Sequence, residues 1–218
     1  MFPIGDDDSH VRITPIVTYA LLAINVAVFL LQLSGGNAFT TQWAFVPGRF
    51  TQNPIGDAQT LLYAMFMHGS WMHLGGNMLY LWIFGNNIED RFGHGPFLLF
   101  YLVSGVLASF AQYFVMPNSM VPNVGASGAI AGVLGAYLLL FPQKKVQVAI
   151  GYAVVWMPAL IVIGFWIVLQ LFSGVGSIAY TDETSDQGGV AYMAHVGGFF
   201  AGLALAFLMR GRGPTHTA

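Results

Sequence analysis

The side chains best suited to chemistry in this sequence are a serine, two histidines and an asparagine, all beside small residues. Ser127 stands in the run Gly-Ala-Ser-Gly, His195 and His73 each precede a Gly-Gly pair by two residues, and Asn77 follows His73 by four. A serine hydroxyl becomes a good nucleophile when a neighbouring base accepts its proton, and a neutral imidazole in a low-dielectric site suits that task. Ser127 and His195 therefore predict acyl transfer, provided that the fold brings them together.

Acyl transfer also needs hydrogen-bond donors aimed at the developing oxyanion, and loss of one such donor slows the reaction by about 10²- to 10³-fold. His73 and Asn77, at i and i+4, would share one helix face and could both donate. The backbone N–H of Ser127, near a helix N-terminus, would be free to join them. These three groups are the predicted oxyanion hole.

The elements that position these residues are predicted to be membrane helices. Only 7% of the 218 residues are charged and 56% are hydrophobic, whereas a soluble domain carries about 25% charged residues. The composition excludes a soluble globular protein, and the charge-free stretches have room for six spans of about 20 residues each. We expect an all-α fold, one domain over 1–218, with helices near 15–33, 72–88, 96–115, 126–141, 148–173 and 190–209.

A transmembrane β-barrel would require polar and apolar positions to alternate over about ten residues. The run from Ala149 to Val155 shows no such alternation, so we predict helix there. The connection near 34–71 mixes aromatic residues with Asn and Gln. It is either an amphipathic segment lying in the membrane interface or an ordinary extracytoplasmic loop.

Basic residues predict the orientation of the helices in the membrane. Those on one side of the predicted membrane are Arg12, Arg91, Lys144, Lys145, Arg210 and Arg212. The other side has only Arg49. By the positive-inside rule both termini are cytoplasmic, in agreement with an even number of spans. The first ten residues lack Lys and Arg, unlike a cleavable signal, and no organellar targeting segment is evident, so we expect a bacterial plasma membrane protein.

Glycine spacing indicates which helices touch. The two small-residue stripes are Gly125, Gly128, Gly132 and Gly135 in the fourth predicted helix, and Gly198 and Gly202 following His195 in the sixth. Each stripe lies on one helix face and permits close backbone contact. If the stripes face each other, Ser127 and His195 come within hydrogen-bonding distance. Taken singly, such stripes mostly serve packing, Asn77 could bridge two helices, and Ser127 could bond its own backbone.

Other chemistries fit the sequence poorly. There is no H-E-x-x-H motif, and His68 and His73 are five residues apart without a helical carboxylate, so a zinc hydrolase is not expected. Every Asp and Glu lies in a loop or at a helix end, which disfavours an aspartyl protease. The chain has no cysteine, and its formal charge of −2 argues against a nucleic-acid partner. We expect no metal and no cofactor.

Taken in order, these residues resemble the rhomboid family of intramembrane serine proteases over 60–209. The matching features are His68 with the His73-x-x-x-Asn77 helix, the Glu89-Asp-Arg91-Phe-Gly93 loop, the Phe-Tyr-Leu-Val-Ser-Gly run ending at Gly105, the Gly125-Ala-Ser127-Gly128 motif, and Ala194-His195 with Gly198 and Gly202. Each feature alone is weak, whereas the ordered set is specific.

The resemblance implies a six-helix core with a water-filled cavity open to the outer face. There Ser127 would attack a peptide bond, His195 would act as general base and then acid, and His73 and Asn77 would line the oxyanion hole. Substrates would be single-span membrane proteins whose helix unwinds near small residues, with the lipid bilayer as the medium.

Glu89 and Arg91 would be structural in this resemblance. The sequence departs from the family in having Gln59-Thr60 where a Trp-Arg pair is common, and Ala131 where an aromatic ring often stacks on the catalytic imidazole. The orientation of that imidazole would then come from packing. These departures suggest an alternative, a non-proteolytic rhomboid-like protein that binds membrane clients. A small transporter or channel lined by the same polar groups is a third hypothesis, weakened by the absence of charges within the predicted spans.

Overall fold

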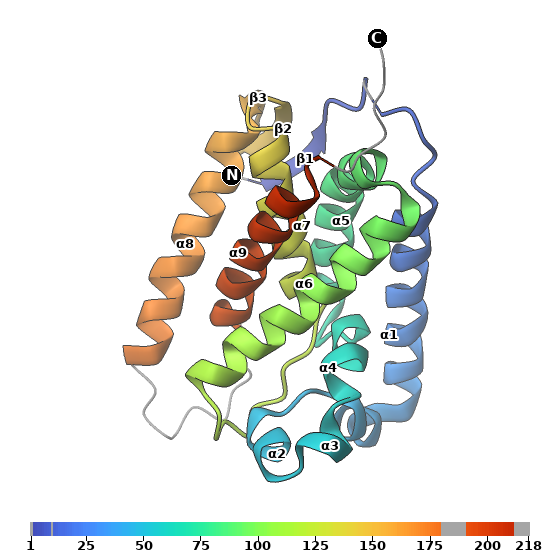
Figure 1. Cartoon of the computed structure of the whole chain (residues 1–218), viewed down its shortest axis with the longest axis vertical. Helices are drawn as coiled ribbons and strands as arrows, with labels where there is room; N and C mark the ends of the chain where they lie inside the picture. Colours follow the sequence, from blue (N-terminus) through green and yellow to red (C-terminus); the bar gives the residue numbers. More distant parts are fainter. Residues whose placement is uncertain (1, 10, 180–190, 212–218) are drawn as a thin grey trace.

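The computed structural model describes residues 2–9, 11–179 and 191–211, and most of these residues are helical. Six long helices form the bundle in Figure 1: α1 (Ile16–Trp43), α5 (Trp71–Phe92), α6 (His94–Val115), α7 (Ser127–Leu140), α8 (Ala159–Ala179) and α9 (Tyr192–Met209). Four predicted helix ends differ from the observed ends by more than two residues: the C-terminal ends of α1 and α5 and both ends of α8. The predicted start of the last helix, at 190, lies outside the described residues.

Helix α1 extends ten residues beyond its predicted end at 33, because the chain continues as helix after a kink. Gly36 is the residue at that kink, with φ of 60°, a left-handed conformation that glycine adopts without steric cost. The apolar run therefore predicted the first part of α1 correctly. Gly35 and Gly36, which resemble a turn, bend the helix but do not end it.

The prediction of helix over 148–158 was wrong, and the predicted all-α fold is instead a mostly helical fold with one small sheet. Strands β2 (Lys145–Ile150) and β3 (Ala153–Pro158) form an antiparallel hairpin, and β1 (Phe2–Asp6) pairs with β2 to give the sheet order β1-β2-β3. Gly151, with φ of 58°, supplies the tight turn that a two-residue hairpin loop requires. The valines of this run favour a strand. Val146 and Val148, at alternate positions of β2, are both buried.

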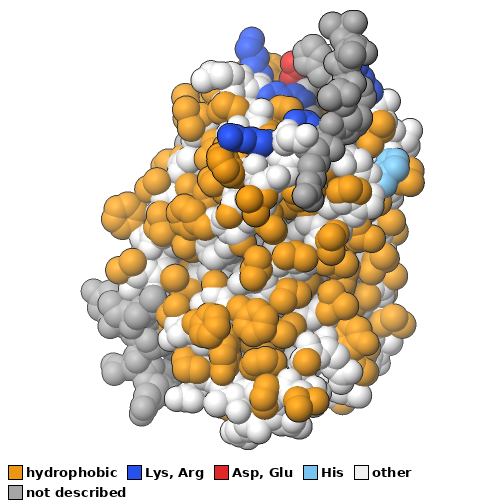
Figure 2. Space-filling view, in the orientation of Figure 1, with side chains coloured by type: hydrophobic (Ala, Val, Ile, Leu, Met, Phe, Trp, Pro, Cys, Tyr) orange, Lys and Arg blue, Asp and Glu red, His pale blue; other side chains and the backbone are white. Residues whose placement is uncertain are grey.

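In the part of the chain that the structure describes, three helices are long and apolar enough to cross a membrane, namely α1, α6 and α9. Helix α7 and residues 159–175 of α8 are shorter apolar helices. Helix α5 is 22 residues long but ends in the charged run from Glu89 to Arg91. On the face drawn in Figure 2, hydrophobic side chains cover the length of the bundle and the visible Lys and Arg side chains gather at one end. The architecture is that of an integral membrane protein.

Helix α7 lies at the centre of the bundle and packs against α5, α6, α8 and α9. Its contact with α9 is between backbones. A methyl group at Gly198 would lie 2.1 Å from the carbonyl oxygen of Gly128, and one at Gly202 would lie 2.1 Å from that of Gly132. The two glycine stripes do face each other, which brings the first turns of α7 and α9 together.

The end of the bundle that carries the sheet is held by polar contacts from α5. The buried Glu89 carboxylate accepts hydrogen bonds from the N–H groups of Val17 (2.8 Å) and Thr18 (2.7 Å), so it caps the N-terminus of α1. Arg91 donates to the carbonyl oxygen of Arg210 (2.5 Å), beyond the last turn of α9. These two side chains link α5 to the first and last helices.

The N-terminal strand β1 is attached to the same end of the bundle through the carboxyl group of Asp6. Tyr137 donates to Asp6 Oδ2 (2.6 Å), and Asn87 Nδ2 donates to the same oxygen (2.8 Å). Burial raises the pKa of Asp6 to about 7, and the nearby Asp8 adds to the shift while Lys144 opposes it.

The connection between α1 and α5 consists of short helices. They are α2 (Pro47–Gln52), α3 (Pro54–Asp57), α4 (Thr60–Tyr63) and the 3₁₀ turn η1 (Ala64–Phe66). Arg49 holds this segment together by donating to the Asp57 carboxylate and to the carbonyl oxygens of Thr41 and Ala44. Arg49 therefore links α2 and α3 to the end of α1.

Candidate active site

Ser127 is the first residue of α7, and the loop before it is fixed by backbone contacts. The N–H of Gly125 donates to the carbonyl oxygen of Ala64 (2.9 Å). Gly125 has φ of 131°, and a methyl group there would lie 2.8 Å from His73 Nε2. Only glycine combines this conformation with so close an approach. The loop therefore brings the helix N-terminus and the hydroxyl of Ser127 beside the His73 ring.

His195 lies in the first turn of α9 and accepts a hydrogen bond from Ser127. The distance from Ser127 Oγ to His195 Nε2 is 2.8 Å, within the normal range for a strong hydrogen bond. On the other side of the ring, His195 Nδ1 lies 2.7 Å from Gln170 Oε1 of α8. The Trp166 and His195 ring centroids are 6.0 Å apart. The imidazole is thus positioned by a hydrogen bond at each ring nitrogen and by the neighbouring Trp166 ring.

The first residues of α5 place His73 and Asn77. Ser70 caps the helix by accepting from the N–H of His73 (3.1 Å), and the N–H of Gly69 donates to His73 Nδ1 (3.3 Å). Because Nδ1 of a neutral imidazole that accepts a hydrogen bond carries no proton, Nε2 of His73 is the donor. That nitrogen faces Gly125, next to Ser127.

Asn77 is buried, and its Nδ2 atom has no hydrogen-bond partner among the described residues. A buried amide donor without a partner is costly unless something else accepts from it. His68 is also buried, and its ring centroid lies 5.1 Å from that of His73. Together with the unbonded N–H of Ser127 at the start of α7, His73 and Asn77 could donate to one anion.

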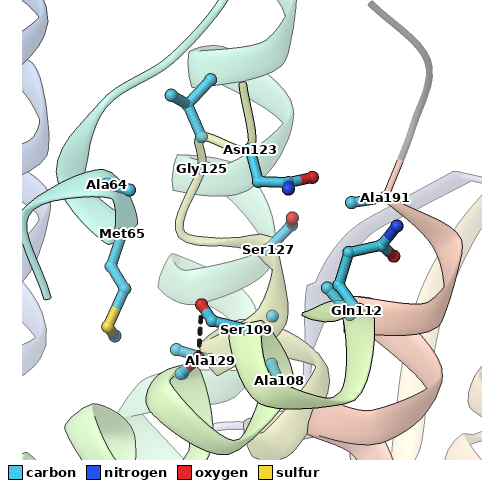
Figure 3. Close-up of a pocket in the computed structure, with 14 residues that line it drawn as sticks. Ala64, Met65, Ala108, Ser109, Gln112, Asn123, Gly125, Ser127, Ala129 and Ala191 are labelled. Carbon is cyan, nitrogen blue, oxygen red and sulfur yellow. Dashed lines mark hydrogen bonds between the residues drawn. The ribbon is translucent and has the colours of Figure 1, made fainter. Parts of the chain in front are cut away.

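A pocket lies beside the Ser127 hydroxyl (Figure 3). In that view the Ser127 side chain points toward Asn123, with Ala191 and Gln112 across the pocket. Most of the remaining lining residues are small: Ala64, Gly105, Ala108, Gly128, Ala129 and Ala194. The small lining side chains leave open space directly beside the hydroxyl.

The structure brings together Ser127, His195 and His73, on three different helices. It places Glu89 and Arg91 elsewhere, in the last turn of α5, whereas His73 is in the first. No group of three or more His, Cys, Asp or Glu side chains among the described residues could hold a metal ion.

Sequence reasoning missed Gln170 and Trp166. It assigned the orientation of His195 to packing, whereas Gln170 also bonds the ring. A signal for Gln170 exists in the sequence, because an amide within a long apolar run is costly and marks a candidate site. Trp166 precedes it by four residues, and residues at i and i+4 share one helix face.

The bundle of apolar helices thus holds a hydroxyl hydrogen-bonded to an imidazole, with further hydrogen-bond donors beside them. The family model for the rhomboid domain matches residues 56–212. The chain therefore belongs to the rhomboid family.

Individual relatives come from bacteria and from eukaryotic organelles. The chain is 33% identical over 196 residues to rhomboid protease GluP of Bacillus subtilis, a match over 88% of this chain and 35% of that protein. It is 35% identical over 135 residues to the mitochondrial Rhomboid protein 1 of Saccharomyces cerevisiae, over 60% of this chain and 38% of that protein. The human mitochondrial presenilin-associated rhomboid-like protein is 34% identical over 103 residues, or 45% of this chain and 27% of its own length. The chain spans about a third of the length of these relatives.

Proposed function

We propose that this protein is an intramembrane serine endopeptidase in which Ser127 is the nucleophile and His195 the general base. The observation that carries the proposal is the 2.8 Å contact between Ser127 Oγ and His195 Nε2, in a chain of the rhomboid family. Relatives such as the Bacillus subtilis protein are named as proteases.

In the proposed reaction the Ser127 hydroxyl attacks the carbonyl carbon of a peptide bond while its proton passes to His195 Nε2. The tetrahedral intermediate collapses as His195 returns that proton to the leaving amine, which leaves an acyl-enzyme. A water molecule, deprotonated by the same imidazole, then attacks the ester and releases Ser127. Each proton transfer passes through His195 Nε2, which finally returns a proton to Ser127 Oγ.

The oxyanion of the intermediate would be stabilised by His73 Nε2–H, Asn77 Nδ2–H and the N–H of Ser127. The Nε2 proton of His73 is favoured because Nδ1 already accepts from Gly69 (3.3 Å). The Asn77 amide has no competing partner among the described residues. Donors that are in place before the reaction stabilise the developing charge without reorganisation.

The substrates we propose are single-span membrane proteins that unwind near small residues. A peptide bond is accessible to Ser127 only where the substrate backbone is not in a helix, since helical N–H and C=O groups are paired with each other. The alanine and glycine lining of the pocket leaves space for an unwound substrate backbone beside Ser127. No cofactor or metal is required for this chemistry.

We further propose that all six long helices span the membrane as one domain over 1–218, with both termini cytoplasmic, in a bacterial plasma membrane. Because the chain has no cysteine, single cysteines report topology directly. In spheroplasts, an impermeant maleimide should label Asn37→Cys and should label Ser9→Cys only after permeabilisation. Labelling of both before permeabilisation would contradict this orientation. Asn37 and Ser9 are both exposed.

The decisive experiment is labelling of the purified protein by a fluorophosphonate, together with cleavage of a transmembrane substrate. Ser127→Ala and His195→Ala should each abolish both signals, whereas Ser34→Ala, at an exposed serine in α1, should abolish neither. The alternative of non-proteolytic client binding predicts no labelling of the wild-type protein and client binding that both substitutions leave intact. Cleavage that persists in Ser127→Ala would refute the assignment of the nucleophile.

A further inference from the structure

We infer that Gln170 is a positioning residue for His195, so that the reactive unit is a hydrogen-bonded chain Ser127–His195–Gln170. The inference rests on the proposed protease function and extends it by a residue on a third helix. Gln170 acts through the imidazole and does not itself touch the substrate.

The contact geometry gives Gln170 a defined effect on the imidazole. Its Oε1 atom lies 2.7 Å from His195 Nδ1, and an amide oxygen only accepts hydrogen bonds. The ring proton of neutral His195 therefore stays on Nδ1, and Nε2 keeps a free lone pair directed at Ser127 Oγ, 2.8 Å away. The other tautomer would carry its proton toward the hydroxyl and would leave the amide oxygen of Gln170 without a donor.

The same hydrogen bond persists through the reaction. When His195 takes the serine proton it becomes an imidazolium, and both ring nitrogens then donate. Nδ1–H already points at Gln170 Oε1, so the positive charge forms next to the negative end of an amide dipole. No group has to reorient for this stabilisation to occur.

Trp166 supports the same ring from one turn earlier in α8. Its ring centroid lies 6.0 Å from that of His195, with the planes tilted by 36°. Trp166 and Gln170 are at i and i+4 and share the helix face that meets α9. They supply from α8 the contacts that Ala131, on α7, lacks the side chain to make.

The position of Gln170 in an apolar helix argues against a purely structural role. The segment from Ala159 to Phe172 contains no other polar side chain except the indole of Trp166. Placing an amide in such a run costs free energy relative to an apolar side chain of the same size. The hydrogen bond to His195 is the contact of Gln170 Oε1 that offsets this cost.

Two substitutions test the inference because they separate hydrogen bonding from packing. Gln170→Met keeps the length and volume of the side chain and removes the acceptor. Gln170→Glu keeps an acceptor oxygen at the same distance. Leu169→Met, at the neighbouring exposed position of α8, is the matched control and should leave turnover and thermal stability unchanged.

In reconstituted vesicles, Gln170→Met should lower kcat on the order of 10- to 100-fold with little change in KM. This is less than the about 10²- to 10⁴-fold that acid–base transfer itself contributes. Its melting temperature should equal or exceed that of the wild type, and Gln170→Glu should recover most of the lost kcat. A Met variant with wild-type kcat would overturn the inference. Equal loss in both variants together with a lower melting temperature would also overturn it, because the role would then be structural.

A second measurement does not depend on turnover. With ¹⁵N-labelled histidine in the Ser127→Ala protein, the His195 signals, assigned by their loss in His195→Gln, should show the proton on Nδ1. Adding Gln170→Met should shift the tautomer population toward Nε2–H. An Nε2-protonated ring in the protein that retains Gln170, or no response to Gln170→Met, would contradict the inference. Failure of the proposed protease function alone would appear instead as absent cleavage with the Nδ1–H tautomer intact.

Discussion

Replacing Gly198 by alanine should separate α7 from α9 and thereby break the contact between Ser127 and His195. The added methyl carbon would lie 2.1 Å from the carbonyl oxygen of Gly128, whereas a carbon and an oxygen normally approach to about 3.3 Å. The obstacle is backbone, so the two helices must move apart by about 1.2 Å. If that movement reaches the first turns in full, the 2.8 Å separation of Ser127 Oγ and His195 Nε2 becomes about 4 Å, beyond hydrogen-bonding range.

The expected consequences follow from this displacement. Overpacking of a close contact costs about 1–3 kcal/mol of stability, and a misplacement of about 1 Å in a reacting group costs on the order of 10²-fold in rate. Thermal unfolding in detergent and fluorophosphonate labelling rates measure the two effects separately. Leucine at the same position should lower both further.

The matched control is Gly164→Ala in α8, where a methyl group would meet no atom within 4 Å. That substitution should leave labelling unchanged and raise stability by about 0.5–1 kcal/mol, since glycine in a helix interior is unfavourable relative to alanine. A Gly198→Ala protein that matches the wild type in both melting temperature and labelling rate would refute the reasoning about the helix contact.

Three further predictions use other contacts. Burial raises the pKa of Asp6 from 3.8 to about 7, so the folded protein holds this proton more tightly than the unfolded chain and stability should fall as pH rises across that interval; Asp6→Asn should remove this part of the pH dependence of the melting temperature. Glu89→Leu should cost about 3 kcal/mol or more, because the N–H groups at the start of α1 lose a buried charged acceptor, and chemical unfolding that shows no loss would exclude the capping role. Gly125→Ala should reduce fluorophosphonate labelling far more than it reduces thermal stability, since its methyl group would lie 2.8 Å from His73 Nε2; undiminished labelling would remove His73 from the proposed oxyanion hole.

The sequence predicted which side chains the structure brings together because membrane helices make polar residues and close contacts conspicuous. In an apolar span a histidine such as His195 is rare enough to stand out, and a spacing of 3 and 4 between small residues defines one helix face. Since a polytopic bundle has few such faces, the stripe of Gly198 and Gly202 had one plausible partner, the stripe of α7. The structure shows this contact, while the catalytic role of Ser127 and His195 remains the proposal.

The β-hairpin could not be predicted from hydrophobicity alone. The run from Val146 to Met157 is apolar apart from Gln147 and the turn residue Gly151, and short apolar runs fit a buried strand as well as a helix. What decides the outcome is tertiary: β1 from the N-terminal end of the chain pairs with β2, and Val146 and Val148 of β2 join the hydrophobic core. In β2 the buried valines alternate with more exposed residues, whereas β3 is apolar at every position and shows no such alternation.

Gln170 illustrates a different reason why sequence reasoning stopped short. The polar residues predicted to converge lie on helices that enter the membrane from the same face, and each lies close to that face. Gln170 lies in the middle of α8, which runs in the opposite direction, so it reaches His195 only because α8 packs directly against the first turns of α9. The energetic signal was nevertheless present, since an unexplained amide in an apolar helix requires an acceptor or a donor from another helix. In a membrane bundle each such amide therefore implies a hydrogen-bond partner. His195, which was predicted to bond Ser127 through one ring nitrogen, still had the other nitrogen available for such a partner.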